Sequence, residues 1–380
     1  MPALTPLAPE DALRLNVLLA NRPLAIRIDE SRLRVHGLTA KGESEIPLHP
    51  TCRDDRYIKA VKELLSGHVL GSPGGYPVYL QRWTRMGQMR DESLEQLLVL
   101  GEPEAVVAAV CAPGLTDELA RRAWWAMEDA ENARQMLMKP AVAAGSMGPE
   151  LADYLVEHLP FETETDRIIE TVRLVLQPGL IDAQRRAELW QKGQRKSAIL
   201  VGFIAAIPDG LPLDVPAHPL RADCPCALAD AEHADGAEAQ VLCRALSASG
   251  QGFLQTVAAI LKKPGDQEIV NRTLDITAAY FAPLRAAEGP VDKTLEALSA
   301  EADAWLAERL RDPALAAMGA AAPKGLAARL RACHILSGLS YGAVRPVFKG
   351  STATGSLMRR KLAPVLEPLN AELNLLLHAD

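Results

Sequence analysis

The sequence predicts a mainly α protein of HEAT-like stacked helical hairpins, an α-solenoid or an irregular helical bundle, with a small N-terminal α/β element. Three observations predict this class. The 380-residue chain is rich in Ala and Leu, which are strong helix formers, and aromatic residues make up only 4%. From residue 91 onward, short amphipathic segments are separated by Gly and Pro. A helix, turn and helix pattern also occurs twice.

The first 90 residues are expected to form a small mixed α/β domain. Between residues 24 and 47, apolar residues recur at every second position within short runs, which is typical of strands. Gly37 and Gly42 lie between these runs, where turns are expected. The pattern therefore predicts a small β-meander. Helices are predicted on either side of it, over residues 10–20 and 57–65.

The repeated pattern is a helix, a Pro-Gly turn and a second helix. Pro113-Gly114 is followed by an Arg-Arg-Ala triplet and Trp125, and the same order recurs about 65 residues later, ending at Trp190. The second helix carries an apolar stripe that an isolated hairpin could not bury, so neighbouring hairpins would have to stack on it. Residues 91–207 are therefore the expected repeat region.

Two copies are few for a repeat protein, and the alternative is an irregular helical bundle in which the similarity arises by chance. If the repeat is real, Trp125 and Trp190 occupy equivalent positions on the second helices of two hairpins. Leu115 and Leu180 should then pack beneath these tryptophans.

Residues 208–236 are expected to form a long loop or linker, because five prolines there would interrupt any continuous helix. Helical periodicity then resumes, and residues 237–380 are predicted to form a C-terminal helical bundle. Its helices are expected over residues 237–247, 253–262, 267–281, 291–311, 326–336 and 357–378.

Charge and hydropathy exclude several classes. The net charge of −7 disfavours nucleic acid as a partner, because binding to its backbone needs clustered Lys and Arg. The longest apolar run, residues 198–207, has about half of the roughly 20 residues that a membrane-spanning helix needs, so a buried core helix is expected. The start of the chain lacks the pattern of a secretory signal, and the six cysteines are too sparse for a disulfide scaffold. We therefore expect a cytoplasmic protein with reduced thiols.

Two glycine-containing motifs imitate known sites. Residues 338–342 match the G-x-S-x-G pattern of a hydrolase nucleophile elbow, but the preceding segment is helical and too little chain follows for the other catalytic residues. Residues 350–356 have the glycine spacing of a phosphate loop without its lysine. We interpret the first as a break between helices and the second as a helix cap, and we expect no catalytic, cofactor-binding or metal-binding residues.

The most suggestive chemistry is the Cys224-Pro225-Cys226 sequence in the proline-rich loop, flanked by His218 and His233. Two thiols on such a loop could bind a soft metal or exchange sulfur as a persulfide pair. The histidine spacing is not that of a standard zinc site, and only Arg221 is placed to lower a thiol pKa. Loop cysteines without a special role are the third interpretation.

A candidate interaction surface contains a basic stretch and the arginines of the first hairpin. It consists of Arg82, Trp83, Arg85, Arg121 and Arg122. Such residues could hold an anion or an acidic partner surface. The alternative interpretation is that neighbouring carboxylates neutralise the arginines. These carboxylates are Glu92, Asp117, Glu118 and Asp182.

Three segments carry a resemblance to a known family: GGYPVYLQRWTRMGQ over residues 74–88, LGEPE over 100–104 and RRAWW over 121–125. They resemble the DsrS family, soluble cytoplasmic accessory proteins encoded with the dissimilatory sulfite reductase system of sulfur-oxidising bacteria. The resemblance extends over about residues 20–200. It implies a pathway and a compartment, and it implies no site residue.

The sequence supports two functional hypotheses. The first is a non-catalytic helical scaffold or regulatory accessory protein in bacterial sulfur oxidation, with a component of the Dsr system as its protein partner. The second is a sulfur-handling protein that uses Cys224 and Cys226. Exposure of both thiols would be necessary for the second hypothesis.

Overall fold

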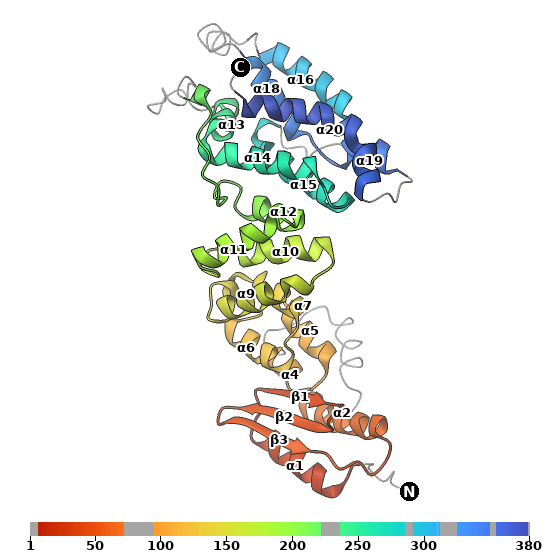
Figure 1. Ribbon diagram of the computed structural model, residues 1–380. Helices are drawn as coiled ribbons and strands as arrows, with labels where there is room; N and C mark the ends of the chain where they lie inside the picture. Colours follow the sequence, from red (N-terminus) through yellow and green to blue (C-terminus); the bar gives the residue numbers. More distant parts are fainter. Residues whose placement is uncertain are drawn as a thin grey trace. The chain divides into compact units, whose positions relative to one another are not determined.

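The structure is a computed structural model that describes residues 7–71, 94–221, 236–285, 292–309, 311, 325–349 and 355–378. The chain forms two compact units (Figure 1). Unit 1 contains residues 1–160 and 177–181, and unit 2 contains residues 161–176 and 182–380. The prediction of a mainly helical protein with a small antiparallel sheet near its N-terminus is confirmed.

Unit 1 begins with a three-stranded antiparallel meander between two helices. Its elements are α1 (Pro9–Ala20), β1 (Ala25–Asp29), β2 (Arg34–Thr39), β3 (Gly42–Pro47) and α2 (Asp54–Leu70). The strand order is β1, β2, β3, as the alternating pattern predicted. One core cluster joins all five elements and includes Leu15, Ile26, Val35, Ile46 and Val61.

One predicted turn residue lies elsewhere. Gly42 has a φ of 117° and follows the β2–β3 turn, whereas Gly37 lies within β2. A Cβ atom on Gly37 would overlap the side chain of Leu18, so the missing side chain lets α1 pack closely on the sheet. The prediction of a turn at Gly37 is therefore wrong. Glycine occurs both at turns and where two elements approach closely, and the sequence alone does not distinguish the two cases.

Short helices complete the described part of unit 1. They are α4 (Leu94–Leu97), α5 (Pro103–Cys111), α6 (Asp117–Ala126), α7 (Ala130–Leu137), α8 (Pro140–Ala143) and α9 (Met147–His158). A 3₁₀ turn, Leu159–Phe161, follows α9. On the face of the sheet opposite α1, Arg27 donates a hydrogen bond to the carbonyl of Trp125 and its guanidinium lies 5.0 Å from the indole centroid. This contact ties α6 to β1.

The described part of unit 2 contains helices and connecting loops, with no strand. Its α-helices are α10 (Thr165–Val175), α11 (Ala183–Gly193), α12 (Ser197–Ala206), α13 (Ala237–Leu246), α14 (Ala248–Lys262), α15 (Gln267–Tyr280), α16 (Leu295–Arg309), α18 (Leu326–Ser337), α19 (Tyr341–Phe348) and α20 (Gly355–Leu377). Two 3₁₀ turns are Pro219–Arg221 and Ala282–Leu284. The apolar run of residues 198–207 forms α12, which packs against α10, α11, α14 and α15. It is the buried core helix that was predicted.

No helix in the described ranges is both long and apolar enough to cross a membrane. Within the proline-rich segment, residues 208–221 contain no helix longer than one 3₁₀ turn. Asp209 accepts a forked pair of hydrogen bonds from Arg244, and the amide of His218 donates to the carbonyl of Leu246. This part of the loop is thus held against α13.

In both copies of the hairpin pattern, a side chain caps the N-terminus of the second helix. Thr116 accepts a hydrogen bond from the amide of Leu119, and Asp182 accepts one from the amide of Arg185. Each cap is followed eight residues later by a buried tryptophan, which is 6% exposed in α6 and 4% exposed in α11. These tryptophans are Trp124 and Trp190.

The predicted equivalence of Trp125 and Trp190 is therefore wrong. Trp124 packs edge-on against Tyr154 at 4.8 Å, and Trp190 packs in the same way against Phe203 at 5.0 Å. Trp125 is only partly buried. The loop between the Pro-Gly pair and the cap is one residue longer in the second copy, which shifts the equivalence by one position. Leu115 and Leu180 are both buried.

The pairing of helices differs between the copies. In unit 1, α5 packs against α6 and α7, whereas in unit 2, α10 packs mainly against α12. The α10–α12 contact is close because Gly202 lies where a Cβ atom would be 2.5 Å from Val172 Cβ. A HEAT-like repeat is therefore not confirmed.

Candidate functional site

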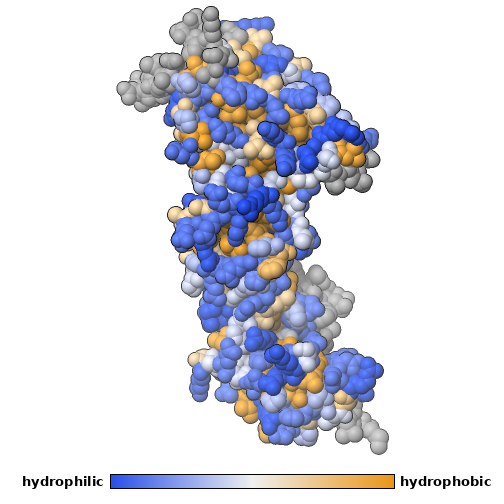
Figure 2. All heavy atoms as spheres, in the orientation of Figure 1, coloured by the Kyte–Doolittle hydropathy of each residue, from blue (hydrophilic) through white to orange (hydrophobic). Residues whose placement is uncertain are grey.

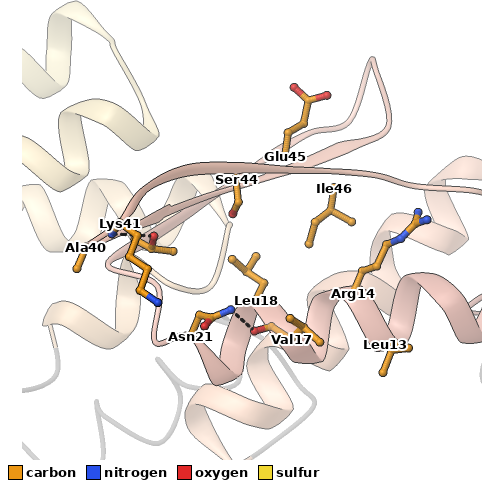
Figure 3. Close-up of a pocket in the computed structure, with 11 residues that line it drawn as sticks. Leu13, Arg14, Val17, Leu18, Asn21, Ala40, Lys41, Ser44, Glu45 and Ile46 are labelled. Atoms are coloured by element: carbon orange, nitrogen blue, oxygen red, sulfur yellow. Dashed lines mark hydrogen bonds between the residues drawn. The ribbon is translucent and has the colours of Figure 1, made fainter.

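A groove between α1 and β3 is the candidate site. It has a volume of about 630 Å³ and is shown in Figure 3. Its lining comes from three segments: α1 and its C-cap contribute Leu13, Arg14, Val17, Leu18 and Asn21, the end of β2 and the following turn contribute Thr39, Ala40 and Lys41, and β3 contributes Ser44, Glu45 and Ile46. Leu18 and Ile46 point toward each other across it. The groove is thus a gap where the helix and the edge of the sheet diverge.

The outer side of α1 is unusually apolar. Leu15, Leu18 and Leu19 are buried in the core, yet Leu13 is 65% and Val17 is 54% exposed. Residues four apart lie on one helix face, so Leu13 and Val17 form a second apolar stripe beside the groove. Figure 2 shows apolar patches among polar side chains over the part of the molecule that contains α1 and the sheet. Contiguous exposed apolar surface of this kind is typical of binding sites.

The charged residues of the groove lie at its ends. Lys41 marks the end formed by the turn, where Figure 3 shows its amine directed toward Asn21. Arg14 marks the other end and pairs with exposed Glu10 at 2.6 Å. The carboxylate of Glu45 points away from the groove and pairs with Arg34. The groove therefore presents an apolar centre between two cations.

A buried carboxylate holds α1 in place. Asp11 is fully buried and accepts hydrogen bonds from the Tyr57 hydroxyl and from the His49 amide, both at 2.6 Å. His49 Nδ1 also lies 2.9 Å from Asp11 Oδ1. Burial alone would raise the pKa of Asp11, but these hydrogen bonds hold it below its ordinary value. Burial and the bond to Asp11 raise the pKa of Tyr57 to about 12.

Sequence reasoning missed this cluster. Asp11 stands on the core stripe of α1, four residues before Leu15 and seven before Leu18, and a carboxylate there needs buried donors. This position was the available signal that Asp11 is buried, but it did not identify His49 and Tyr57 as the donors. The His49 ring contacts Asp11 through Nδ1, and its side chain is 60% exposed.

Of the predicted interaction surface, Arg82, Trp83 and Arg85 lie outside the described residues. Arg121 forms two hydrogen bonds with Glu118, and Arg122 forms one with Glu118 at 2.9 Å.

The two arginines, Arg121 first, lower the pKa of Glu118 to about 2. Asp117 accepts hydrogen bonds from Ser146 and from the amide of Met147, and Asp182 accepts one from the amide of Arg185 as the cap of α11. Neither Arg121 nor Arg122 lines the α1–β3 groove. Arg122 instead lines a smaller cavity of about 360 Å³ in unit 1, together with Arg22, His68 and Glu95.

The G-x-S-x-G motif joins helices instead of exposing a nucleophile. Gly338 leaves room for the guanidinium of Arg285, and a Cβ on Gly342 would lie 2.6 Å from the backbone of Asp292 and Lys293. Ser340 is the N-cap of α19, accepts from the Gly342 amide at 3.2 Å and donates to Asp292 at 3.1 Å. The motif is the break between helices that the sequence predicted.

Replacing Ser340 with alanine should lower the free energy of unfolding by about 1 kcal/mol, because α19 loses its cap. Ser340→Thr, which keeps a hydroxyl, should lose less. Equilibrium urea unfolding followed by circular dichroism measures both variants. A loss close to zero for Ser340→Ala would contradict the capping role.

The candidate thiols Cys224 and Cys226 lie outside the described residues. Cys52, Cys111 and Cys333 are free, and burial raises the pKa of the Cys333 thiol far above its ordinary value.

Cys243 is disulfide-bonded, so the expectation of reduced thiols is wrong for it. His218 is buried. No group of three or more potential metal ligands occurs among the residues that the structure describes. Comparisons with protein-family models, with curated proteins and with solved structures found no match to this chain.

Proposed function

We propose that this chain is a cytoplasmic, non-catalytic accessory protein of bacterial sulfur oxidation that binds a partner protein through the α1–β3 groove. The observation that carries the binding role is the exposed pair Leu13 and Val17 beside an apolar groove of about 630 Å³. Removing such side chains from water is favourable by roughly 25 cal/mol for each Å² of apolar surface, and this gain opposes the entropic cost of association. The cations at both ends of the groove can orient the partner.

The pathway follows from the resemblance to the DsrS family. Two of the segments that carry the resemblance, 100–104 and 121–125, contribute to the fold of unit 1: Leu100 and Trp124 are buried, and Gly101 has a φ of 69° beside Ile28. HEAT-like stacking belongs to the same proposal, because stacked hairpins would supply an extended surface for a partner from the Dsr system.

The alternative function, sulfur handling by Cys224 and Cys226, concerns residues outside the described ranges. Replacing both cysteines with serine distinguishes the two proposals. The accessory role predicts unchanged oxidation of stored sulfur in cells that carry this variant. Complete loss of oxidation with an intact fold would favour sulfur handling.

Val17→Asp should reduce recovery of the partner at least tenfold when the tagged full chain is purified from cells grown on reduced sulfur. A carboxylate there would have to be desolvated against the apolar partner surface. Quantitative mass spectrometry of the co-purified proteins measures the effect. The matched control is Val107→Asp on α5, because Val107 is also exposed, at 41%, and does not line the groove.

Three outcomes separate the parts of the proposal. A Dsr-system component recovered by the wild type and by Val107→Asp, and lost with Val17→Asp, supports it. Equal recovery by both variants would exclude the groove as the binding surface. Absence of any Dsr-system component from the wild-type sample would contradict the assignment to sulfur oxidation.

A further inference from the structure

The strand that borders the groove is an open edge of the sheet. On the opposite edge, β1 is continued by the segment after α4: the amide of Ile26 donates to the carbonyl of Leu98, and Arg27 forms a parallel bridge with Gly101. In the part of the chain that the structure describes, β3 pairs only with β2. Its outer main-chain groups are thus available to another strand.

The register identifies those groups. The amide of Leu48 donates to the carbonyl of Leu33, and in an antiparallel pair every second residue points its main-chain groups at the neighbouring strand. Ser44 pairs with Gly37, and Ile46 pairs with Val35. Because Ser44 and Ile46 are four and two residues before Leu48, their main-chain groups also point toward β2. The amides and carbonyls of Glu43 and Glu45 therefore point outward.

The side chains of β3 alternate between the two faces of the sheet. Ser44 and Ile46 face the groove and α1. Glu43 accepts a hydrogen bond from the indole of Trp125 at 2.6 Å, and Glu45 pairs with Arg34. Both carboxylates are thereby held on the face of the sheet away from the groove. The side chains that an added strand directs into the groove would therefore not contact these carboxylates.

We propose that the partner contributes an extended segment that pairs with β3 as a fourth strand. This rests on the proposed function. Two apolar side chains of the segment, two residues apart and opposite Ser44 and Ile46, would lie over Leu18 in the groove. Added strands commonly bind in this way, with main-chain hydrogen bonds giving affinity and alternate side chains giving specificity.

The charge at one end of the groove predicts one further feature of the partner's extended segment. Within the described residues, Lys41 has no ion-pair partner, whereas Arg14 already pairs with Glu10. Lys41 stands at the turn between β2 and β3, so an acidic residue of the segment belongs at that end. At the other end Pro47 has no amide hydrogen to donate, which limits the pairing to a short stretch. The expected motif is therefore two alternate apolar residues with an acidic residue beyond one of them.

The probe is a displayed library of random dodecapeptides selected on the immobilised full chain. Selected peptides should share the alternating apolar pair and the acidic residue. On the Lys41→Met variant, the apolar pair should persist and the acidic preference should disappear. Selection of peptides with apolar residues at helical spacing, three and four apart, would overturn the inference and leave the proposed function standing.

Glu45→Pro tests the main-chain contact directly. It removes the outward amide hydrogen of residue 45 and leaves the bonds between β2 and β3 in place. The matched control Glu45→Ala loses the same carboxylate but keeps the amide. Affinity for a selected peptide, measured by fluorescence anisotropy, should fall about tenfold with Glu45→Pro and stay within about twofold with Glu45→Ala.

A second measurement does not depend on the fold of a variant. Selected peptides are resynthesised with N-methyl groups on alternate amides. Methylation at positions that face β3 should abolish binding to the wild-type chain, and methylation of the other set should not. Equal effects of the two sets would overturn strand addition. If Val17→Asp also fails to weaken these peptides, the groove itself is wrong and the proposed function fails with it.

Discussion

Gly250→Ala should lower the free energy of unfolding of unit 2 by about 3 kcal/mol, because its methyl group would collide with main-chain atoms. Helices α13 and α14 are separated by Ser247 alone. A Cβ on Gly250 would overlap the carbonyl oxygen of Arg244 and lie 2.6 Å from that of Ala245. Carbonyl groups at a helix end cannot rotate away as a flexible side chain can, so the corner itself would have to open.

Gly252→Ala in the same helix is the matched control. The nearest atom to its Cβ would be 3.9 Å away, on Leu213, which is an ordinary contact. Alanine there should raise stability by up to about 1 kcal/mol, because glycine is the poorer helix former. Urea unfolding followed by circular dichroism measures both variants. Equal changes for Gly250→Ala and Gly252→Ala would show that the corner is not tight.

Protonation of His334 should remove about 3 kcal/mol of stability between pH 7 and pH 4. His334 is 4% exposed on α18 and stacks on Trp305 with ring centroids 4.4 Å apart. Burial, and then the guanidinium of Arg285, lower its pKa to about 4 from 6.5, with Lys293 adding to the effect and Glu301 opposing it. Between these pH values the unfolded chain binds the proton and the folded chain does not, so stability falls as the pH falls.

The variant His334→Phe isolates this contribution, because phenylalanine can keep the stack on Trp305 and does not titrate. The free energy of unfolding is measured against pH for both proteins. The difference between them should change by about 3 kcal/mol from pH 7 to pH 4 and level off below the folded pKa. Parallel profiles for wild type and His334→Phe would contradict the assignment.

Local patterns predicted the elements well. Strand alternation gave the meander, and helical periodicity gave most helices, since both depend on residues close in sequence. The patterns did not determine which individual residue faces the core. Trp124 and Trp125 are adjacent, and only the cap at Thr116 shows which of them faces the core. Gly37 was misplaced because its role depends on Leu18, from another element.

The groove could not be predicted from the sequence. Helix α1 has apolar residues on two faces, and the core covers one of them, so Leu13 and Leu15 look alike until the sheet is in place. The open edge of β3 depends on how the segment at Leu98 pairs with β1, which is a contact over about 70 residues. Likewise, the position of Asp11 on the core stripe of α1 indicates burial, but its donors His49 and Tyr57 lie far away in the sequence and could be identified only from the structure.

The bonds of Asp11 also set an order of events during synthesis. Translation delivers α1 well before residues 49 and 57, which supply all three hydrogen bonds to its buried carboxylate. Until those residues leave the ribosome, seating α1 on the sheet would strand a charge in an apolar core. We therefore expect α1 to dock on the sheet only after residues 49 and 57 are available, and until then both of its apolar faces are exposed to solvent.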